Sequence, residues 1–243
     1  SYFIGNHKSP WLVVAYGMIG ASLSGVTFIS VPGWVGSTGF SYFVIVLGYV
    51  VGYAVISGVL LPVYYKLNLT SIYTYLEMRF GKYSYKTGAV FFLISRIIGS
   101  SFRMFLVVSV LQLFVFNYFH IPFWATVVLF LVIIQLYTLK AGIKTIVWTD
   151  MLQTTFMLLS VLLTIWIILQ KMNINFGTLY HQVVVSNYSK IIVTDIKSPQ
   201  NFLKLFLSGI FITIVMTGLD QDMMQKNLSC RNLKDARKNM TSL

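Results

Sequence analysis

Asp150 is the residue whose surroundings most strongly suggest a chemical role. It is the only acidic residue between Glu77 and Asp195, and it lies at the start of a long apolar run. An unpaired charge in hydrocarbon costs at least about 2.5 kcal/mol, so this carboxylate must remain near polar headgroups or find a partner inside the protein. Asp150 is therefore a candidate cation ligand. The alternative is an acid that the positive end of a helix favours by about 0.3–1 kcal/mol.

A second candidate site interrupts the apolar sequence 11–31. Its centre combines two glycines with several hydroxyl side chains, namely Gly20, Ser22, Ser24, Gly25 and Thr27. Glycine costs about 1 kcal/mol relative to alanine within a helix, so we predict local unwinding here. Unwound backbone offers carbonyl groups and half-helix ends to a small cation and a polar solute. Two alternatives remain: a packing face of small residues, or hydroxyls bonded to their own helix.

A similar interruption occurs near residues 209–222. A glycine and hydroxyl side chains again lie in apolar sequence, and Asp220 and Asp222 follow. Matched interruptions in the first and sixth helices are typical of transporters built from an inverted repeat of five helices. Hydropathy alone instead ends the apolar segment at Leu219 and places both acids at the inner membrane surface.

Composition identifies the class of protein that must position these residues. Of the 243 residues, 57% are hydrophobic and 10% are charged, and the mean hydropathy is +0.78, which leaves too little polar surface for a soluble globule. The apolar runs do not alternate as barrel strands do. We therefore predict an all-α membrane protein, a polytopic helix bundle that forms one transmembrane domain over 1–243. The six predicted helices are 11–31, 40–64, 87–116, 123–139, 146–169 and 202–223.

The formal charge of +12 follows from topology rather than from nucleic-acid binding. With both ends of the chain on the cytoplasmic side, the inner loops hold twelve lysines and arginines and the outer loops hold four. This asymmetry predicts a multi-pass protein of the inner (cytoplasmic) membrane, in contact with the lipid bilayer and without a nucleic-acid partner. The three histidines lack paired-ligand spacing, so neither a metal centre of the zinc type nor a membrane-embedded enzyme is indicated.

Three ordered motifs carry a family resemblance. The longest is Tyr137-Thr-Leu-Lys-Ala-Gly-Ile-Lys-Thr-Ile-Val-Trp-Thr-Asp-Met-Leu-Gln153. It is preceded by Tyr2-Phe-Ile-Gly-Asn with Pro10-Trp11, and followed by Thr217-Gly-Leu-Asp-Gln-Asp-Met-Met-Gln-Lys with Ala236-Arg237. The first of these motifs resembles the junction of the fourth and fifth core helices in the sodium:solute symporter family. The second resembles the family's loop before the first core helix, and the third resembles the end of its sixth core helix.

The resemblance implies a fold and an activity. The fold is the LeuT-like broken-helix architecture of five plus five inverted helices, of which this chain holds core helices one to six, the first half and one helix more. The activity is sodium-coupled symport of a small polar organic solute by alternating access, with Na⁺ as the coupling ion and no cofactor. The alternative is a sensing or anchoring domain of a larger signalling protein.

The resemblance also implies site residues. Sodium binds the backbone carbonyls of Gly20 and Leu23, with Asp150 near its route and with hydroxyls of an eighth core helix beyond Leu243. The solute contacts polar positions beside the two breaks, which correspond to Ser24, Thr27, Asp220 and Gln221. Sugar-transporting members carry Gln and Glu on the second helix. Residues 40–64 contain neither, which argues against a simple hexose.

Overall fold

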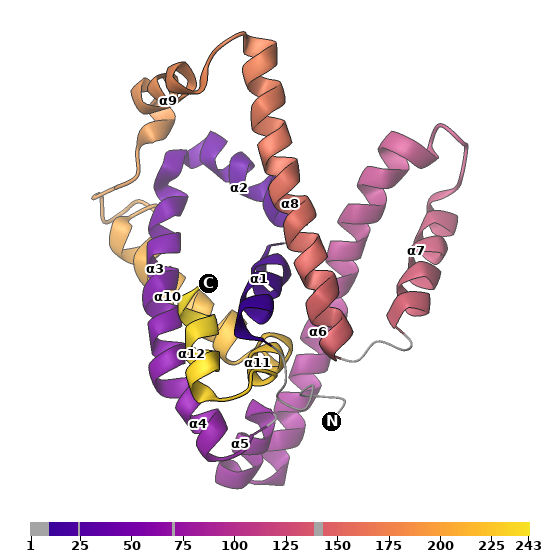
Figure 1. Cartoon of the computed structure of the whole chain (residues 1–243), viewed down its shortest axis with the longest axis vertical. Coiled ribbons are helices and arrows are strands. Elements are labelled where there is room, and N and C mark those ends of the chain that lie inside the picture. Colours follow the sequence, from indigo (N-terminus) through magenta and orange to yellow (C-terminus); the bar gives the residue numbers. More distant parts are fainter. Residues whose placement is uncertain (1–9, 24, 70, 139–142) are drawn as a thin grey trace. The chain divides into compact units, whose positions relative to one another are not determined.

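The computed structural model describes residues 10–23, 25–69, 71–138 and 143–243, and within these ranges the chain folds into helices and loops without a β-strand (Figure 1). Two compact units are present. One comprises Ser71–Gly142, and the other combines Ser1–Thr70 with Ile143–Leu243. The larger unit contains both interrupted segments, so it holds every described candidate site residue.

Among the described residues, the larger unit contains nine α-helices. They are α1 (Trp11–Ser22), α2 (Gly25–Thr38), α3 (Tyr42–Val55), α4 (Leu61–Lys66), α8 (Ile143–Met172), α9 (Phe176–Val185), α10 (Phe202–Thr213), α11 (Gln221–Leu228) and α12 (Leu233–Thr241). π-Helical turns at Ile56–Leu60 and Ile214–Gly218 continue α3 and α10.

The smaller unit consists of α5 (Ile72–Phe80), α6 (Lys82–Leu111) and α7 (Phe123–Thr138). Gly81 separates the first two helices with φ +87°, a left-handed conformation that glycine adopts without strain. Helix α6 begins at Lys82, whereas the predicted helix begins at residue 87. The prediction starts later because it follows hydropathy, which excludes the basic first turns.

Within the ranges that the structure describes, three helices have the length and apolar composition to cross a membrane, namely Val26–Lys66, Lys82–Phe116 and Trp148–Met172. The bent pair Phe202–Gly218 and Gln221–Leu228 counts as a fourth if it forms one span. Trp11–Ser22 and Phe123–Leu136 are shorter apolar helices. These segments overlap the six predicted helices, and most of their large hydrophobic side chains are exposed, as expected of surfaces that face lipid or further helices.

The first predicted helix is interrupted at the expected place. Helix α1 ends at Ser22, Leu23 is extended with φ −89° and ψ 125°, and α2 begins at Gly25. This break confirms the predicted unwinding. Helix α2 then runs through Pro32 to Thr38, past the predicted end at residue 31. Its last turn is stabilised by the hydroxyl of Thr38, which donates to the carbonyl of Trp34 at 2.9 Å.

The sixth predicted helix is interrupted as well. The axis bends by 66° between Phe202–Gly218 and Gln221–Leu228. Asp220 lies in the bend with extended backbone, and its Oδ1 accepts a hydrogen bond from the backbone N–H of Met223 at 3.1 Å. An aspartate at this position caps the new helix and complements its dipole. The acids therefore start a second helical segment rather than follow the last one.

Glycines allow α3 and α10 to pack with their backbones in contact (Figure 1). A Cβ atom on Gly48 would lie 2.9 Å from Cα of Gly209, and one on Gly52 would lie 2.7 Å from Cβ of Thr213. A Cβ atom on Gly209 would clash with the carbonyl oxygen of Ile45. Small residues at such crossings maximise van der Waals contact in a solvent where apolar burial gives no driving force.

Replacing Gly209 with leucine is expected to destabilise this crossing by about 2 kcal/mol, because the added side chain must push two backbones apart. The measurement is the melting temperature of the detergent-solubilised full-length protein, followed by size-exclusion chromatography. Gly99→Leu on α6 is the matched control, since a Cβ atom there meets nothing within 4 Å in the described residues. Equal melting temperatures for the two variants would contradict the packing role of Gly209.

Candidate functional site

The broken end of α1 lies directly against α8. Gly20 is buried, and a Cβ atom placed on it would lie 2.6 Å from the carbonyl oxygen of Asp150 and would clash with the hydroxyl of Thr154. The Thr154 hydroxyl lies 2.8 Å from the carbonyl oxygens of both Tyr16 and Asp150. A small residue at position 20 and a hydroxyl at position 154 therefore fix the distance between the two helices.

Gln153 joins the two predicted sodium ligands on α1. Its side-chain Nε2 donates to the carbonyl oxygen of Gly20 at 2.8 Å and to that of Leu23 at 3.3 Å. Both carbonyls are available because the helix stops at Ser22. The break thus aims two backbone oxygens at one polar side chain of α8, an arrangement of oxygen atoms that suits a small hard cation.

Asp150 has a charged partner inside the protein, which is one of the two alternatives that its place in an apolar run allowed. Its carboxylate Oδ2 lies 2.8 Å from Nζ of Lys226 on α11, and the same Nζ lies 3.3 Å from Oδ2 of Asp222. The side chain of Lys226 is 5% exposed, that of Asp150 14% and that of Asp222 51%. The three residues form a linked ion pair, which we call the inner triad, and it connects α8 to the second half of the broken sixth helix.

The described candidate solute ligands lie at the breaks or just after them. Thr27 is half-buried in the first turn of α2, Asp220 caps α11, and Gln221 is the half-buried first residue of that helix. Ser24 lies outside the described residues. Helices α1 and α11 are in contact, so the two interrupted segments meet within the larger unit.

Helix α12 packs against both α1 and α11 and so stabilises the region where they meet. The amide of Asn239 donates to Oδ1 of Asn227 at 2.7 Å and lies 3.2 Å from the sulfur of Met18, and all three side chains are buried. The ammonium of Lys238 lies 5.9 Å from the ring centre of Trp11, at the start of α1. These contacts tie α1 and α11 to a common neighbour.

Gln153 and Lys226 were missed by sequence reasoning. Gln153 follows Asp150 by one helical turn and so shares its face of α8, a spacing that was visible in the motif. Lys226 is one turn after Asp222 and forms the same kind of pair within α11. Neither spacing reveals which other helix each side chain reaches.

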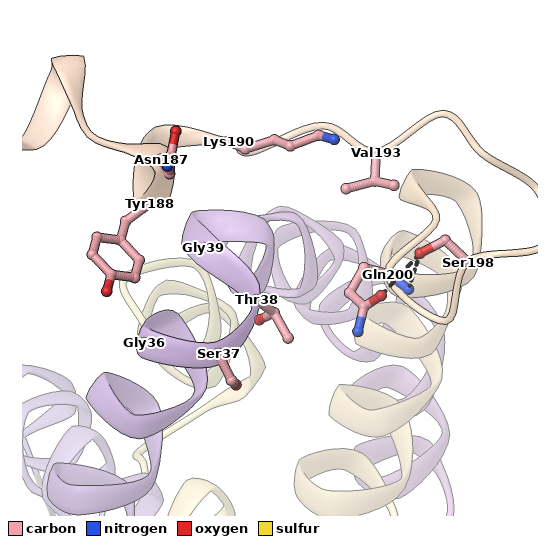
Figure 2. Close-up of a pocket in the computed structure, with 10 residues that line it drawn as sticks. All are labelled: Gly36, Ser37, Thr38, Gly39, Asn187, Tyr188, Lys190, Val193, Ser198 and Gln200. Atoms are coloured by element: carbon pink, nitrogen blue, oxygen red, sulfur yellow. Dashed lines mark hydrogen bonds between the residues drawn. The ribbon is translucent and has the colours of Figure 1, made fainter.

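A polar pocket of about 390 Å³ lies elsewhere in the same unit, between the end of α2 and the segment that joins α9 to α10 (Figure 2). Thr38 and Gln200 enter it from the two sides, and the hydroxyl of Ser198 donates to Oε1 of Gln200 at 2.9 Å. Gly39 has φ +68° and lies below the backbone of Tyr188, whose carbonyl oxygen would be 2.9 Å from a Cβ atom. The helix breaks do not contribute to its lining.

Among the described residues, no group of three His, Cys, Asp or Glu side chains could hold a metal ion. The candidate site consists of backbone carbonyls, one amide and one buried ion pair. Such a site can bind and release a weakly held ion, and its carbonyl groups lie where α1 ends.

Similar proteins are sodium-coupled transporters. The chain is 25% identical to the human sodium/iodide cotransporter over 241 residues, which cover 97% of this chain and 36% of that protein. It is 29% identical to the rabbit sodium-dependent multivitamin transporter over 238 residues, 96% of this chain and 36% of that protein. The mouse sodium-coupled monocarboxylate transporter 2 is 25% identical over 243 residues, 97% of this chain and 38% of that protein. No solved structure gives a significant match.

The two interrupted apolar segments belong to an all-helical, polytopic membrane helix bundle. The chain belongs to the sodium:solute symporter family, whose model matches residues 2–242. The predicted fold class and the family resemblance are thereby confirmed. The chain spans just over a third of the length of the relatives it matches.

Proposed function

We propose that the full-length protein is a sodium-coupled symporter in which the break of α1 provides the sodium site. The observation that carries this proposal is the convergence of the Gly20 and Leu23 carbonyls on Gln153. Carbonyl oxygens that a helix break releases from intrahelical hydrogen bonds are ligands that a sodium ion accepts, and the names of these relatives all specify sodium. Asp150 adds a negative charge one helical turn from Gln153.

The solute we propose is small and polar, and it binds beside the two breaks. Thr27, Asp220 and Gln221 are the described candidates, together with Ser24. The named solutes of the relatives include iodide and monocarboxylates, which are small. A solute bound near both half-helix ends would contact α2 and α11 together, so its affinity would depend on the positions of both helices.

Coupling follows from the shared contacts of α1. Sodium between the Gly20 and Leu23 carbonyls would order the break, and an ordered break would position the polar residues of α2 for the solute. Each ligand then raises the affinity for the other by the same factor. The sodium gradient drives uptake through alternating access, with no covalent chemistry, and we place the protein in the cytoplasmic membrane as a multi-pass transporter.

The test is solute accumulation in liposomes that contain the full-length protein. Iodide and lactate, a monocarboxylate, are offered outside under an inward sodium gradient, and potassium replaces sodium in parallel vesicles. We expect at least one of them to accumulate above its equilibrium level only with the sodium gradient, and to stimulate the entry of radioactive sodium. Equal uptake in sodium and potassium, or no sodium-dependent uptake of either probe, would refute the proposal as stated.

A further inference from the structure

Lys226 occupies an unusual position for a lysine. Its side chain is almost fully buried, and its ammonium group lies between the carboxylates of Asp150 and Asp222. Lysine is almost never fully buried unless it is paired. The two partners differ, because the Asp150 carboxylate is largely enclosed whereas that of Asp222 is half exposed. One cation thus has an inner partner and an outer partner, both within 4 Å.

The inner partner belongs to the face of α8 that contacts the proposed sodium site. Asp150, Gln153 and Thr154 lie at positions i, i+3 and i+4 of one helix and so share one face. The latter two contact the end of α1 through Gly20 and Tyr16. Lys226 itself belongs to α11, the segment that follows the break in the sixth helix. The ammonium group therefore links the face of α8 beside the proposed sodium site to α11, the part of the sixth segment that follows its break.

The contact with Asp150 is close without being an ideal hydrogen bond. Nζ and Oδ2 are 2.8 Å apart, yet Oδ2 has no hydrogen bond of standard angular geometry. The pair is a single contact between one ammonium group and one carboxylate oxygen. A pair of this kind has less geometry to rebuild when the cation moves than a bidentate pair has.

We propose that Lys226 is a positioning residue that competes with sodium for Asp150 and so promotes sodium release. An ammonium group and a sodium ion are both monovalent cations, and one carboxylate cannot neutralise both at close range. With sodium near Asp150, the Lys226 ammonium is repelled toward Asp222. When it returns to Asp150, it replaces the charge of the departing ion. Because Lys226 is part of α11, this exchange also reports the state of the sodium site to the sixth helix.

This inference rests on the proposed function, because it needs sodium to bind near Asp150. It differs from a purely structural ion pair in one respect. Loss of a structural pair would lower the amount of active protein and leave the affinity for sodium unchanged, whereas loss of a competitor must raise that affinity. The direction of the change in sodium affinity therefore separates the two roles.

The experiment is equilibrium binding and release of radioactive sodium by the purified full-length protein, with choline as the inert replacement cation. Lys226→Met should lower the half-saturating sodium concentration about tenfold and slow sodium release, because the tethered charge that opposes the ion is removed. Asp222→Asn should raise that concentration about threefold, because Lys226 then has only Asp150 as a partner. Lys226→Arg keeps the positive charge and should retain the parental affinity.

The outcomes are distinct. An unchanged or higher half-saturating concentration for Lys226→Met would overturn the competitor role. Saturable sodium binding by the parental protein would leave the proposed function intact in that case. An absence of saturable sodium binding by the parental protein would instead refute the proposed function. If Lys226→Met does not fold, Asp222→Asn decides alone, because its neutral amide leaves the buried pair in place. An unchanged or lower concentration for that variant would also overturn the inference.

Discussion

Gly20→Ala is expected to abolish sodium-driven uptake while the protein still inserts into the membrane. The added methyl group would lie 2.6 Å from the carbonyl oxygen of Asp150 and would overlap the Thr154 hydroxyl. The contact is with backbone, which has no rotamer that could move aside, so α1 must shift away from α8. Binding groups need to be held within about 0.5 Å of their working positions, and this shift would separate the Gly20 carbonyl from the other ligands.

Uptake in liposomes, normalised to the amount of inserted protein, measures this effect, and we expect a loss of at least about tenfold. Gly33→Ala on α2 is the matched control, because a Cβ atom there meets nothing within 4 Å among the described residues. Parental uptake by Gly20→Ala would show that the contact between α1 and α8 does not shape the sodium site. Equal losses in both variants would point to a general effect of stiffening the interrupted segment.

The second large effect is expected for Gln153→Leu. Leucine is close in size but cannot donate to the carbonyl oxygens of Gly20 and Leu23, which Gln153 contacts at 2.8 and 3.3 Å. A buried or half-buried carbonyl that loses its partner costs about 1–3 kcal/mol. The break in α1 would then be less stable in the ion-free state, and a rearranged backbone would no longer present both oxygens to sodium.

We expect sodium-driven uptake by Gln153→Leu to fall about tenfold, and the sodium concentration at half-maximal uptake to rise. Gln170→Leu provides the comparison, since this exposed glutamine lies near the other end of the same helix, α8. A Gln153→Leu protein with parental sodium dependence would remove the amide from the proposed site. Reconstituting the two variants in parallel into liposomes from one batch excludes differences in membrane integrity.

Local sequence preferences predicted the interruptions, because they depend on residues that are close together in the chain. Gly20 and its hydroxyl neighbours disfavour a continuous helix, and the structure breaks at Leu23. At the other interruption, Asp220 is a favourable helix cap, and the new segment begins immediately after it. In both places the local energetics and the tertiary fold agree, which is why the pattern was sufficient.

The partners across the site were not predictable in the same way. Gln153 reaches α1 from more than a hundred positions away in the chain, and Lys226 reaches Asp150 across 76 positions. Helical periodicity identifies a face of a helix but not the neighbour that the face meets. The extension of α2 to Thr38 was missed for a related reason, since hydropathy treated Pro32 and the polar residues after it as a loop.

The glycine crossing between α3 and α10 has a consequence for how the molecule can move. Two backbones in direct contact cannot slide or rotate past each other without separating, so these helices must travel as one rigid pair. The nearest point at which the sixth segment can change direction is Leu219, where its axis already turns by 66°. A change of the angle at this break would alter the distance between Lys226 and Asp150.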